Sequence, residues 1–404
     1  MKCIIPTIGT RGDVQPYIAL ALGLQADGHA VTLATHPCMR GLVESYGVTF
    51  APIGPDIDIG QEAARIRANS PHWMVGFMRV MRFTFNMLEQ AHADLLALCR
   101  PVDLVIVSHS AAGSIEADQL GLPTVSVTLM PQAIAVEDPE EGFLKRAAMK
   151  VAGAGMGLMM SRPLNRIRER LGVPPMGPTG ITSPTLNLIP ISPHIEPPNP
   201  LWEARHRVTG YWFAPAPKTW TPPTDLQAFL ESDNSPLVVS LGAMALSGED
   251  ALKAAQTTVA AVQEAGTRAI IQGWDEVMPQ IDLPPTIVHV GAIPHDWLLT
   301  RARGIVHHGG FGTTAAGFRA GIPALVIPHI IDQFIWGQKV AELGVGPEPI
   351  PRRKLTTVTM TTALREMGTA DMQQKAAALG ENIRSEPDGV EKAVELIEEV
   401  LLNG

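Results

Sequence analysis

Residues that can move protons, hold anions or bind sugars gather in three stretches of this chain. Residues 8–14, "IGTRGDV", carry one acid in a glycine loop, and residues 107–113, "VSHSAAG", carry one histidine. Residues 307–334, "HHGGFGTTAAGFRAGIPALVIPHIIDQF", combine an adjacent pair of histidines, several glycines and an Asp-Gln pair. Acids and histidines can act as general acids or bases, and glycine turns before helices bind phosphate.

The stretch at 307–334 predicts a phosphate site followed by a sugar site. A helix is expected to start at about Thr313, where the backbone N–H groups of Gly312 and Thr313 suit an anionic phosphate. His307, at the end of the preceding strand, can donate one more hydrogen bond. The glycines should let the backbone come close and adopt positive φ values; they are Gly309, Gly310 and Gly312.

The same stretch ends in an adjacent carboxylate and amide, Asp332 and Gln333. Such a pair suits bidentate hydrogen bonding to sugar hydroxyls, so the whole stretch is typical of a sugar diphosphate site. The alternative is that His307 and His308 are satisfied core histidines and Asp332 is a helix cap. A metal site is disfavoured, because adjacent residues of a strand point to opposite faces.

The stretch at 8–14 predicts a strand, a glycine loop and a helix, with Pro16 in the first turn and Gly28 at the end. The spacing is not GxGxxG, which disfavours a nicotinamide site. Asp13 is either a general base or a helix cap. His109 either orients or assists Asp13, or caps a helix over 111–119.

Short apolar strands alternate with helices through both halves of the chain. This pattern predicts an α/β fold with two parallel, Rossmann-like sheets, and it places ligands beyond the carboxyl ends of the strands, in a cleft between two domains. The predicted strands are 2–8, 31–35, 103–107 and 124–129 in the first half, and 236–242, 268–271, 286–290, 304–308 and 324–328 in the second.

The domain boundary is predicted from proline-rich stretches at 193–200 and 214–223, since proline stiffens linkers. A chain of 404 residues suits two cores. We therefore expect a first domain over 1–205, a linker over 206–225, a second domain over 226–385 and a final helix over 386–404.

Composition excludes several classes of protein. The net charge of −9 disfavours nucleic acid as a partner. The three cysteines are far apart, which indicates neither a disulfide framework nor a zinc site, and no export signal or long apolar run is evident. A cytoplasmic location is expected.

An apolar helix face predicts where a second ligand binds. Methionines and phenylalanines recur at helical spacing after residue 72, and such side chains form an adaptable wall for a lipophilic molecule. Ordinary core packing would show the same spacing. The predicted set is Met74, Phe77, Met78, Met81 and Phe85, with Leu88 on the same face and Met130 from a later strand end. The basic segment 145–170 is either a lid that touches membrane or a solvated face.

Four blocks of this sequence resemble the UDP-glycosyltransferase superfamily of inverting, two-domain GT-B enzymes. The blocks are "GTRGDVQPYIALALGL", "IPHDWLL", "HHGGFGTTAAGFRAGIPALVIPHIIDQFIWG" and "VAELGVGPEPIPRRKLT". The nearest likeness is to the branch of sterol glucosyltransferases and antibiotic-aglycone glycosyltransferases.

The resemblance implies a role for each matched residue. Asp13 would deprotonate the acceptor hydroxyl, His307 would hold the diphosphate, and Asp332 with Gln333 would hold the sugar. The segment "GAIPHDW", with Ile293, would contact the nucleotide base, and Trp274 is the candidate to stack on uracil, with Trp297 as a competitor. The remaining predicted donor residues are Thr10, Arg11, Gly12 and Gly242.

Two departures from the family pattern concern the donor site. Gly242 is followed by Ala243 and Met244, where relatives often carry a hydroxyl residue, and Phe311 stands where others have a small or amide residue. Donor affinity or phosphate geometry is expected to differ, and the Phe311 ring is expected to narrow the sugar end.

The predicted function is transfer of a hexose, glucose first, from UDP-sugar to a hydroxyl of a lipophilic acceptor such as a sterol, polyketide or flavonoid. UDP-sugar acts as co-substrate, and neither a metal ion nor another cofactor is expected. The resemblance also implies that the helix at 386–404 crosses back to the first domain. The alternatives are an inactive, glycosyltransferase-like binding protein and a sugar-nucleotide epimerase.

Overall fold

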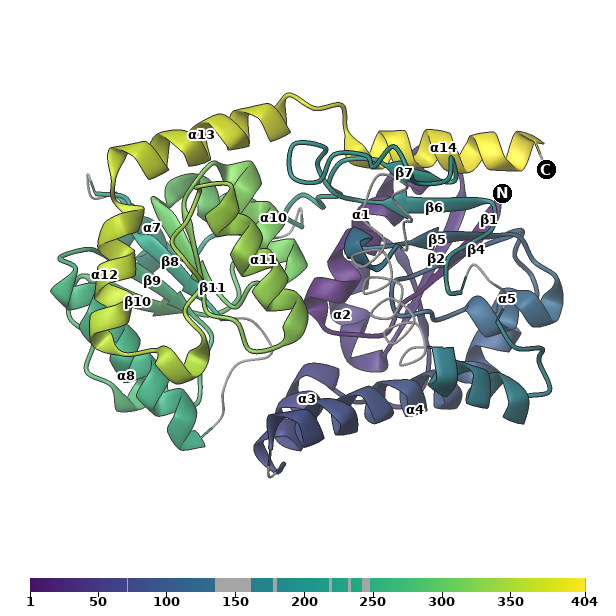
Figure 1. The fold of residues 1–404 in the computed structure, drawn as a ribbon, viewed down its shortest axis with the longest axis horizontal. Helices are drawn as coiled ribbons and strands as arrows, with labels where there is room; N and C mark the ends of the chain where they lie inside the picture. The colour runs from purple at the N-terminus through teal and green to yellow at the C-terminus, as the bar shows by residue number, and fades with distance from the viewer. Residues whose placement is uncertain are drawn as a thin grey trace, which may run out of the picture. The chain divides into compact units, whose positions relative to one another are not determined.

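The structure is a computed structural model in which two compact units each contain one parallel sheet (Figure 1). It describes residues 1–70, 72–134, 161–176, 180–217, 220–231, 234–241 and 248–403. Unit 1 comprises Met1–Ala214 and Pro387–Gly404, and unit 2 comprises Pro215–Glu386. Gly242 and residues 145–160 of the basic segment lie outside the described residues.

The sheet of unit 1 has seven parallel strands in the order β3-β2-β1-β4-β5-β6-β7. The chain reverses its direction of growth at β1, so the ends of β1 and β4 lie side by side at a topological switch point, where doubly wound sheets bind ligands. The strands are β1 Lys2–Pro6, β2 Ala30–Thr35, β3 Thr49–Pro52, β4 Leu104–Val107, β5 Thr124–Val127, β6 Leu186–Ile189 and β7 His206–Val208.

The sheet of unit 2 has five parallel strands in the order β10-β9-β8-β11-β12. The switch point lies between β8 and β11, so the loop after β11 starts at the place where this topology collects ligands. The strands are β8 Leu237–Ser240, β9 Ala269–Gln272, β10 Ile287–Val290, β11 Gly304–His307 and β12 Ala324–Val326.

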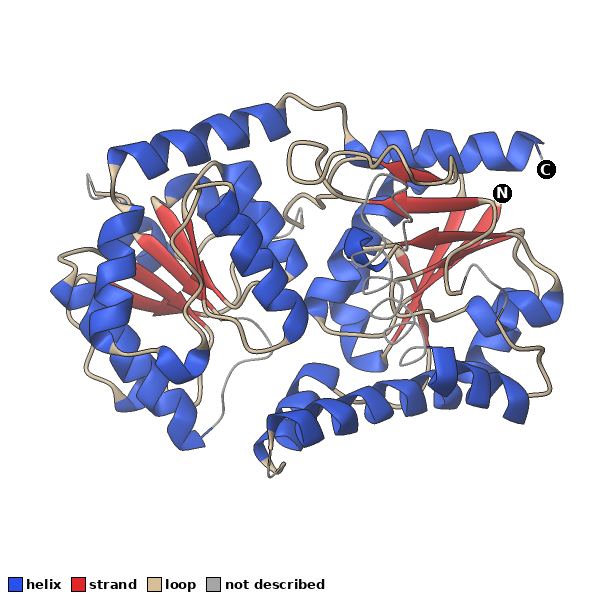
Figure 2. Ribbon diagram, viewed as in Figure 1, coloured by secondary structure: helices blue, strands red, loops and turns tan. Residues whose placement is uncertain are grey.

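Helices cover both faces of each sheet (Figure 2), which is why the central strands are largely buried and include continuous apolar runs such as "LVIV" in β4. In unit 1 they are α1 Arg11–Ala26, α2 Arg40–Ser45, α3 Ile59–Ala68, α4 Trp73–Cys99, α5 Ser114–Leu120 and α14 Gly389–Asn403. In unit 2 they are α7 Thr224–Leu230, α8 Gly248–Glu264, α9 His295–Leu298, α10 Phe311–Ala320, α11 Ile331–Glu342, α12 Thr357–Met367 and α13 Ala370–Arg384.

The nine predicted strands all occur, and the fold class is that predicted. Three short strands, β3, β6 and β7, were not predicted. Strand β7 takes the first three residues of the expected linker, and α7 begins at Thr224 before that linker was expected to end. None of the helices in the described ranges is long and apolar enough to span a membrane.

The last helix, α14, packs on α1 of unit 1. Its apolar stripe, Val390, Ala393, Val394 and Ile397, is buried, and His29 Nε2 lies 2.9 Å from Glu398 Oε1. Gly23 of α1 faces this stripe, and a Cβ at Gly23 would overlap Cγ1 of Val390. The close approach of the two helices therefore depends on a glycine.

We predict that Gly23→Ala lowers the free energy of unfolding by about 1–3 kcal/mol, because an added methyl group overpacks this contact. Gly41→Ala in α2 is the matched control, since a Cβ there meets nothing within 4 Å. The control should be neutral or slightly stabilising. Urea titration measures both, and an unchanged or higher stability for Gly23→Ala would contradict the contact.

Candidate functional site

The first candidate residue, Asp13, lies in the first turn of α1 rather than in the preceding loop as predicted. Helix α1 begins at Arg11, so Asp13 is its third residue. The backbone N–H of Thr10 donates to Asp13 Oδ2 at 2.6 Å, and the Thr10 hydroxyl donates to the same oxygen at 2.9 Å. Oδ2 of Asp13 therefore takes part in capping the helix, as the alternative interpretation predicted, but Thr10 does not bind Oδ1.

Gly9 makes room for this carboxylate. A Cβ at Gly9 would overlap the Asp13 side chain. A side chain at this position would push Asp13 out of its hydrogen bonds, so the placement of the acid depends on this glycine. Arg11 and Gly12, predicted to bind donor, lie exposed in the same turn of unit 1.

His109 reaches the other half of the carboxylate. It follows the end of β4, the strand that pairs with β1, and its Nε2 lies 3.2 Å from Asp13 Oδ1. It does not cap a helix: α5 begins at Ser114 with Gly113 as its N-cap. The structure thus brings together the two residues predicted as the acid–base pair.

The side chains of Asp13 and His109 are 35 % and 24 % exposed, so a substrate can reach them. Burial alone would raise the pKa of Asp13. The hydrogen bonds and charge of His109, together with the Thr10 bonds, outweigh burial and hold the pKa of Asp13 below its ordinary value. The group is therefore a carboxylate at neutral pH.

A third side chain of this cluster, Tyr17, was not predicted. Its hydroxyl lies 2.9 Å from His109 Nδ1 and also accepts the backbone N–H of His109 at 2.9 Å. In the sequence Tyr17 stands within an aliphatic helical run, where nothing distinguishes it from a core residue.

In unit 2, His307 ends β11 with its side chain fully buried. The backbone N–H of Gly309 donates to His307 Nδ1 at 3.0 Å, so in the neutral ring the proton is on Nε2. Burial lowers the pKa of His307 well below its ordinary value, and the nearby His308 and His295 lower it further. His307 is therefore a neutral donor, not a cation.

The Nε2–H group of His307 is buried and has no hydrogen-bond partner among the residues that the structure describes. A buried donor without an acceptor is costly, and such an atom often marks a place for a ligand. The alternative of a satisfied core histidine does not account for it.

Helix α10 starts at Phe311, two residues earlier than predicted, with Gly310 as its N-cap. The first closing hydrogen bond runs from Thr314 N to Gly310 O at 3.0 Å, so the N–H groups of Gly312 and Thr313 have no intrahelical acceptor. Gly309 has φ of 89°, whereas Gly310 and Gly312 do not adopt the positive φ values that were predicted for them. Together with His307, these N–H groups suit an anion.

Asp332 and Gln333 are the second and third residues of α11, directly after the loop that follows β12. The amide oxygen of Gln333 accepts the backbone N–H groups of His329 at 2.7 Å and Ile330 at 3.3 Å. The Gln333 side chain therefore caps this helix, and it is 2 % exposed. Only its amide nitrogen remains to meet a sugar hydroxyl.

The prediction that Trp274 stacks on a base is wrong in this structure. The Trp274 ring is 7 % exposed and packs in the core of unit 2, and its backbone φ is 61°. Its competitor, Trp297, packs edge-on against Trp220 at 5.3 Å and under Arg301 at 4.3 Å.

Ile293, predicted to contact the nucleotide base, accepts a hydrogen bond through its backbone carbonyl from the side-chain amide of Gln272 at 3.2 Å.

The apolar face predicted for the acceptor divides along α4. Phe85 and Leu88 are buried in the core of unit 1, as ordinary packing would have them. Met74 and Met78, near the start of the helix, are 53 % and 56 % exposed. The remaining members are half-buried; they are Phe77, Met81 and Met130.

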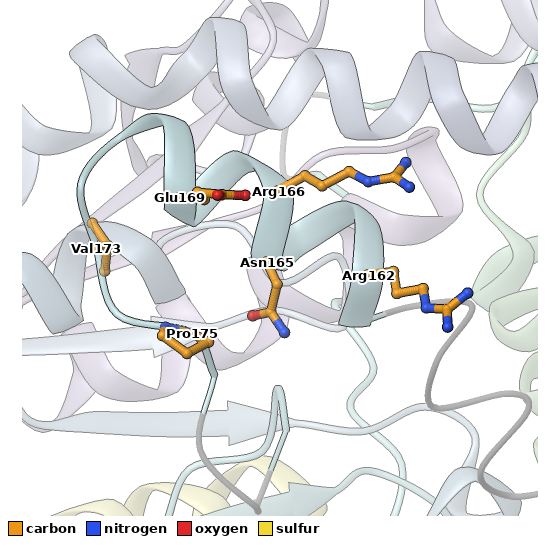
Figure 3. A pocket seen from close by; sticks show the side chains of 6 residues that line it. All are labelled: Arg162, Asn165, Arg166, Glu169, Val173 and Pro175. Carbon is orange, nitrogen blue, oxygen red and sulfur yellow. The ribbon is translucent and has the colours of Figure 1, made fainter.

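A cavity of about 570 Å³ lies elsewhere in unit 1 (Figure 3). It is lined by residues of 162–175, and its lining includes none of the predicted site residues. Its side chains are Arg162, Asn165, Arg166, Glu169, Val173 and Pro175. Two arginines of the basic segment therefore face this cavity.

Neighbouring histidines in unit 2 do not converge on one point. The rings of His307 and His308 are 6.3 Å apart and nearly perpendicular, at 86°. Within the described part of the chain, no group of three or more His, Cys, Asp or Glu side chains is arranged to hold a metal ion.

Comparison with known proteins gives a match in each half of the chain. Residues 3–132 match the glycosyltransferase family 28 N-terminal domain, and residues 256–399 match the C-terminal domain of erythromycin biosynthesis protein CIII-like proteins. A sterol 3-beta-glucosyltransferase of Aspergillus clavatus is 34 % identical over 97 % of this chain and 29 % of that protein. The chain spans only about three tenths of the length of such curated relatives.

Solved structures share the fold. The glycosyltransferase VinC, in complex with DTDP, matches with a TM-score of 0.71 at 22 % identity and covers all of both chains. The glycosyltransferase SnogD from Streptomyces nogalater matches with a TM-score of 0.67 at 22 % identity over 99 % of both chains.

We predict that Asp13 makes stability depend on pH. Because the pKa of Asp13 is lower in the folded chain than its ordinary value of 3.8, Asp13 stabilises the fold above that value, and the contribution is lost as the pH falls through the folded value. The difference in unfolding free energy between the wild type and Asp13→Asn should therefore narrow from pH 7 to about pH 3. Urea titrations across this range measure it, and a constant difference would contradict the lowered pKa.

Proposed function

Because the chain belongs to the UDP-glycosyltransferase superfamily of GT-B proteins, on the branch of the sterol and antibiotic-aglycone glycosyltransferases, we propose that it is an inverting glycosyltransferase. It moves a hexose, glucose first, from UDP-sugar to a hydroxyl of a lipophilic acceptor, with Asp13 as general base. The observation that carries this proposal is the half-exposed Asp13 carboxylate, held by Thr10 and His109 at the switch point of the unit 1 sheet.

Asp13 is suited to accept a proton but not to remove it early. With a pKa below its ordinary value, its carboxylate is always available at neutral pH, yet it is a weak base for an alcohol. Proton transfer must therefore accompany bond making at the sugar. As the acceptor O–H bond breaks, the oxygen forms a bond to the anomeric carbon, and the electron pair of the sugar–phosphate bond leaves with the diphosphate.

The leaving diphosphate needs donors, and unit 2 provides them. The buried Nε2–H of His307 and the N–H groups of Gly312 and Thr313 form the proposed cradle, with no metal ion required. Because His307 is neutral, it contributes a directed hydrogen bond rather than a charge. Asp332 and the amide nitrogen of Gln333 are proposed to bind the sugar hydroxyls.

The acceptor is proposed to be lipophilic on two grounds. The similar protein of Aspergillus clavatus is named a sterol 3-beta-glucosyltransferase. In addition, Met74 and Met78 leave apolar surface exposed on α4 of unit 1, the unit that carries the base.

Mass spectrometry of products tests this function directly. Purified protein is incubated with UDP-glucose and a panel of sterols, flavonoids and polyketide aglycones. A product heavier by one hexose is expected, and Asp13→Asn should lower its rate by about 10²-fold or more. Asp27→Asn, at the exposed end of the same helix, is the matched control and should keep wild-type activity.

No product from any nucleotide sugar, despite tight nucleotide binding, would support the inactive binding protein instead. Asp13→Asn with wild-type activity would show that the reaction does not use this carboxylate.

We predict that His307→Leu weakens the binding of UDP by roughly 10-fold or more, since a hydrogen bond to a charged group is worth about 1.5–3 kcal/mol. His307→Gln, whose amide nitrogen places a donor near the position of Nε2, should lose less. Calorimetric titration with UDP measures both variants. Equal affinity of the two variants would contradict the role of Nε2–H.

A further inference from the structure

The hydroxyl of Tyr17 lies behind the acid–base pair, fully buried in unit 1. Tyr17 stands four residues after Asp13, on the same face of α1. Its oxygen accepts the backbone N–H of His109, and it also lies within hydrogen-bond distance of Nδ1 of the same histidine. One hydroxyl thus holds both the main chain and the ring of His109.

The directions of these hydrogen bonds can be assigned from both ends. An amide N–H can only donate, so the Tyr17 oxygen is an acceptor there, and its own proton is free to be donated to Nδ1. At the other end, the Asp13 carboxylate can only accept, so Nε2 must carry a proton. In the neutral ring, this places the proton on Nε2 and leaves Nδ1 to accept the tyrosine proton.

The Tyr17 ring is held in place by aromatic neighbours. It stacks on the His109 ring at 5.9 Å and 5°, and Trp212 meets its edge at 6.4 Å. The indole N–H of Trp212 donates to the Thr209 hydroxyl at 3.1 Å and to the Gly389 carbonyl at 3.0 Å. The position of the Tyr17 hydroxyl is therefore fixed by the packing of its ring against His109 and Trp212, and Trp212 is in turn held by Gly389 at the start of α14.

The bonds around Asp13 leave one place for a substrate proton. A carboxylate has about four lone-pair positions, two on each oxygen. Both positions on Oδ2 are used by Thr10, and one on Oδ1 is used by His109. The remaining position on Oδ1 lies beside the Nε2–H of His109.

We infer that Tyr17 is a positioning residue of the transfer reaction: its hydroxyl fixes the Nε2–H tautomer of His109, and this directs the free lone pair of Asp13 Oδ1 toward the acceptor hydroxyl. The inference rests on the proposed function, in which Asp13 is the base. Without the tyrosine proton, the ring can hold its hydrogen on Nδ1, and a lone pair on Nε2 then repels the carboxylate.

Tyr17 also prevents the proton taken up by Asp13 from being passed on through His109. Burial raises the pKa of Tyr17 far above neutrality, so the hydroxyl does not ionise to pass a proton onward. With Nδ1 occupied and Nε2 protonated, the ring of His109 has no vacant lone pair. The proton taken from the acceptor therefore remains on Asp13 until the product leaves.

The experiment compares Tyr17→Phe with the wild type. Nitrogen-15 NMR of histidine-labelled protein reports which ring nitrogen of His109 carries the proton, with the signal assigned by its absence in His109→Gln. We expect the Nε2–H form in the wild type and a shift toward Nδ1–H in Tyr17→Phe. We also expect kcat with UDP-glucose to fall by about 10-fold or more while KM for UDP-glucose changes less than about twofold.

Tyr211→Phe is the matched control, because Tyr211 is another buried tyrosine of unit 1. It should change neither the His109 signal nor kcat. An unchanged tautomer in Tyr17→Phe would overturn the inference, and so would a changed tautomer with unchanged kcat. The NMR signal does not depend on turnover, and Asp13→Asn tests the base separately, so failure of the proposed function is distinguishable.

A second pair of variants keeps the test decisive where Tyr17→Phe does not fold. His109→Gln offers an amide N–H that has no tautomer to fix, whereas His109→Leu offers no donor. His109→Gln should keep a kcat at least about 10-fold above that of His109→Leu. Equal rates would overturn the inference, because no donor to Oδ1 would then be needed.

Discussion

The hydrogen bond between His109 Nε2 and Asp13 Oδ1 is the interaction on which the first site depends. It joins the first turn of α1, the helix after β1, to the loop after β4, and these two strands pair at the switch point of the sheet. Gly9 leaves space for the carboxylate, Thr10 fixes its second oxygen, and Tyr17 fixes the histidine. These residues are best understood as one arrangement that keeps a single lone pair of a carboxylate directed outward.

The candidate anion site in unit 2 is built from hydrogen-bond donors rather than from an acid–histidine pair. At the β11 loop, unit 2 offers a neutral His307 donor, buried and without a partner among the described residues, next to the open first turn of α10. Directed dipoles in a buried setting stabilise an anion without the cost of rearranging solvent. The proposed displacement reaction needs both a base for the acceptor hydroxyl and donors for the leaving diphosphate.

The sequence predicted the central strands because they are buried on both faces and are therefore continuously apolar. It did not predict β3, with half-exposed "TFAP", or β7, with only "HRV", because strands at the edges of the sheet need fewer apolar residues. Strand β6, "LNLI", carries a buried Asn187. The amide of Asn187 is hydrogen-bonded to Ser126 and His206, and only the folded chain shows these partners.

Candidate site residues could be selected from the sequence where the residue type itself indicates a chemical role, as for an acid or a histidine. The sequence predicted Asp13, His109 and His307 at or just after strand ends; His307 does end β11 and His109 follows β4 closely, whereas Asp13 lies in the first turn of α1. Tyr17 was not predictable, because a tyrosine in a buried helix usually fills space. The burial of Trp274 was not predictable either, because it depends on core contacts with residues distant in the sequence.

The anomeric configuration of the first product tests the central claim most directly, since a base on the acceptor and a cradle on the leaving group together imply one displacement at the anomeric carbon. Proton NMR of the product formed from α-linked UDP-glucose reads the coupling of the anomeric proton. A β-glycoside formed from the start of the reaction is predicted. An α-glycoside would contradict the account, because retention requires either a second displacement or a front-side route that this arrangement of Asp13 does not serve.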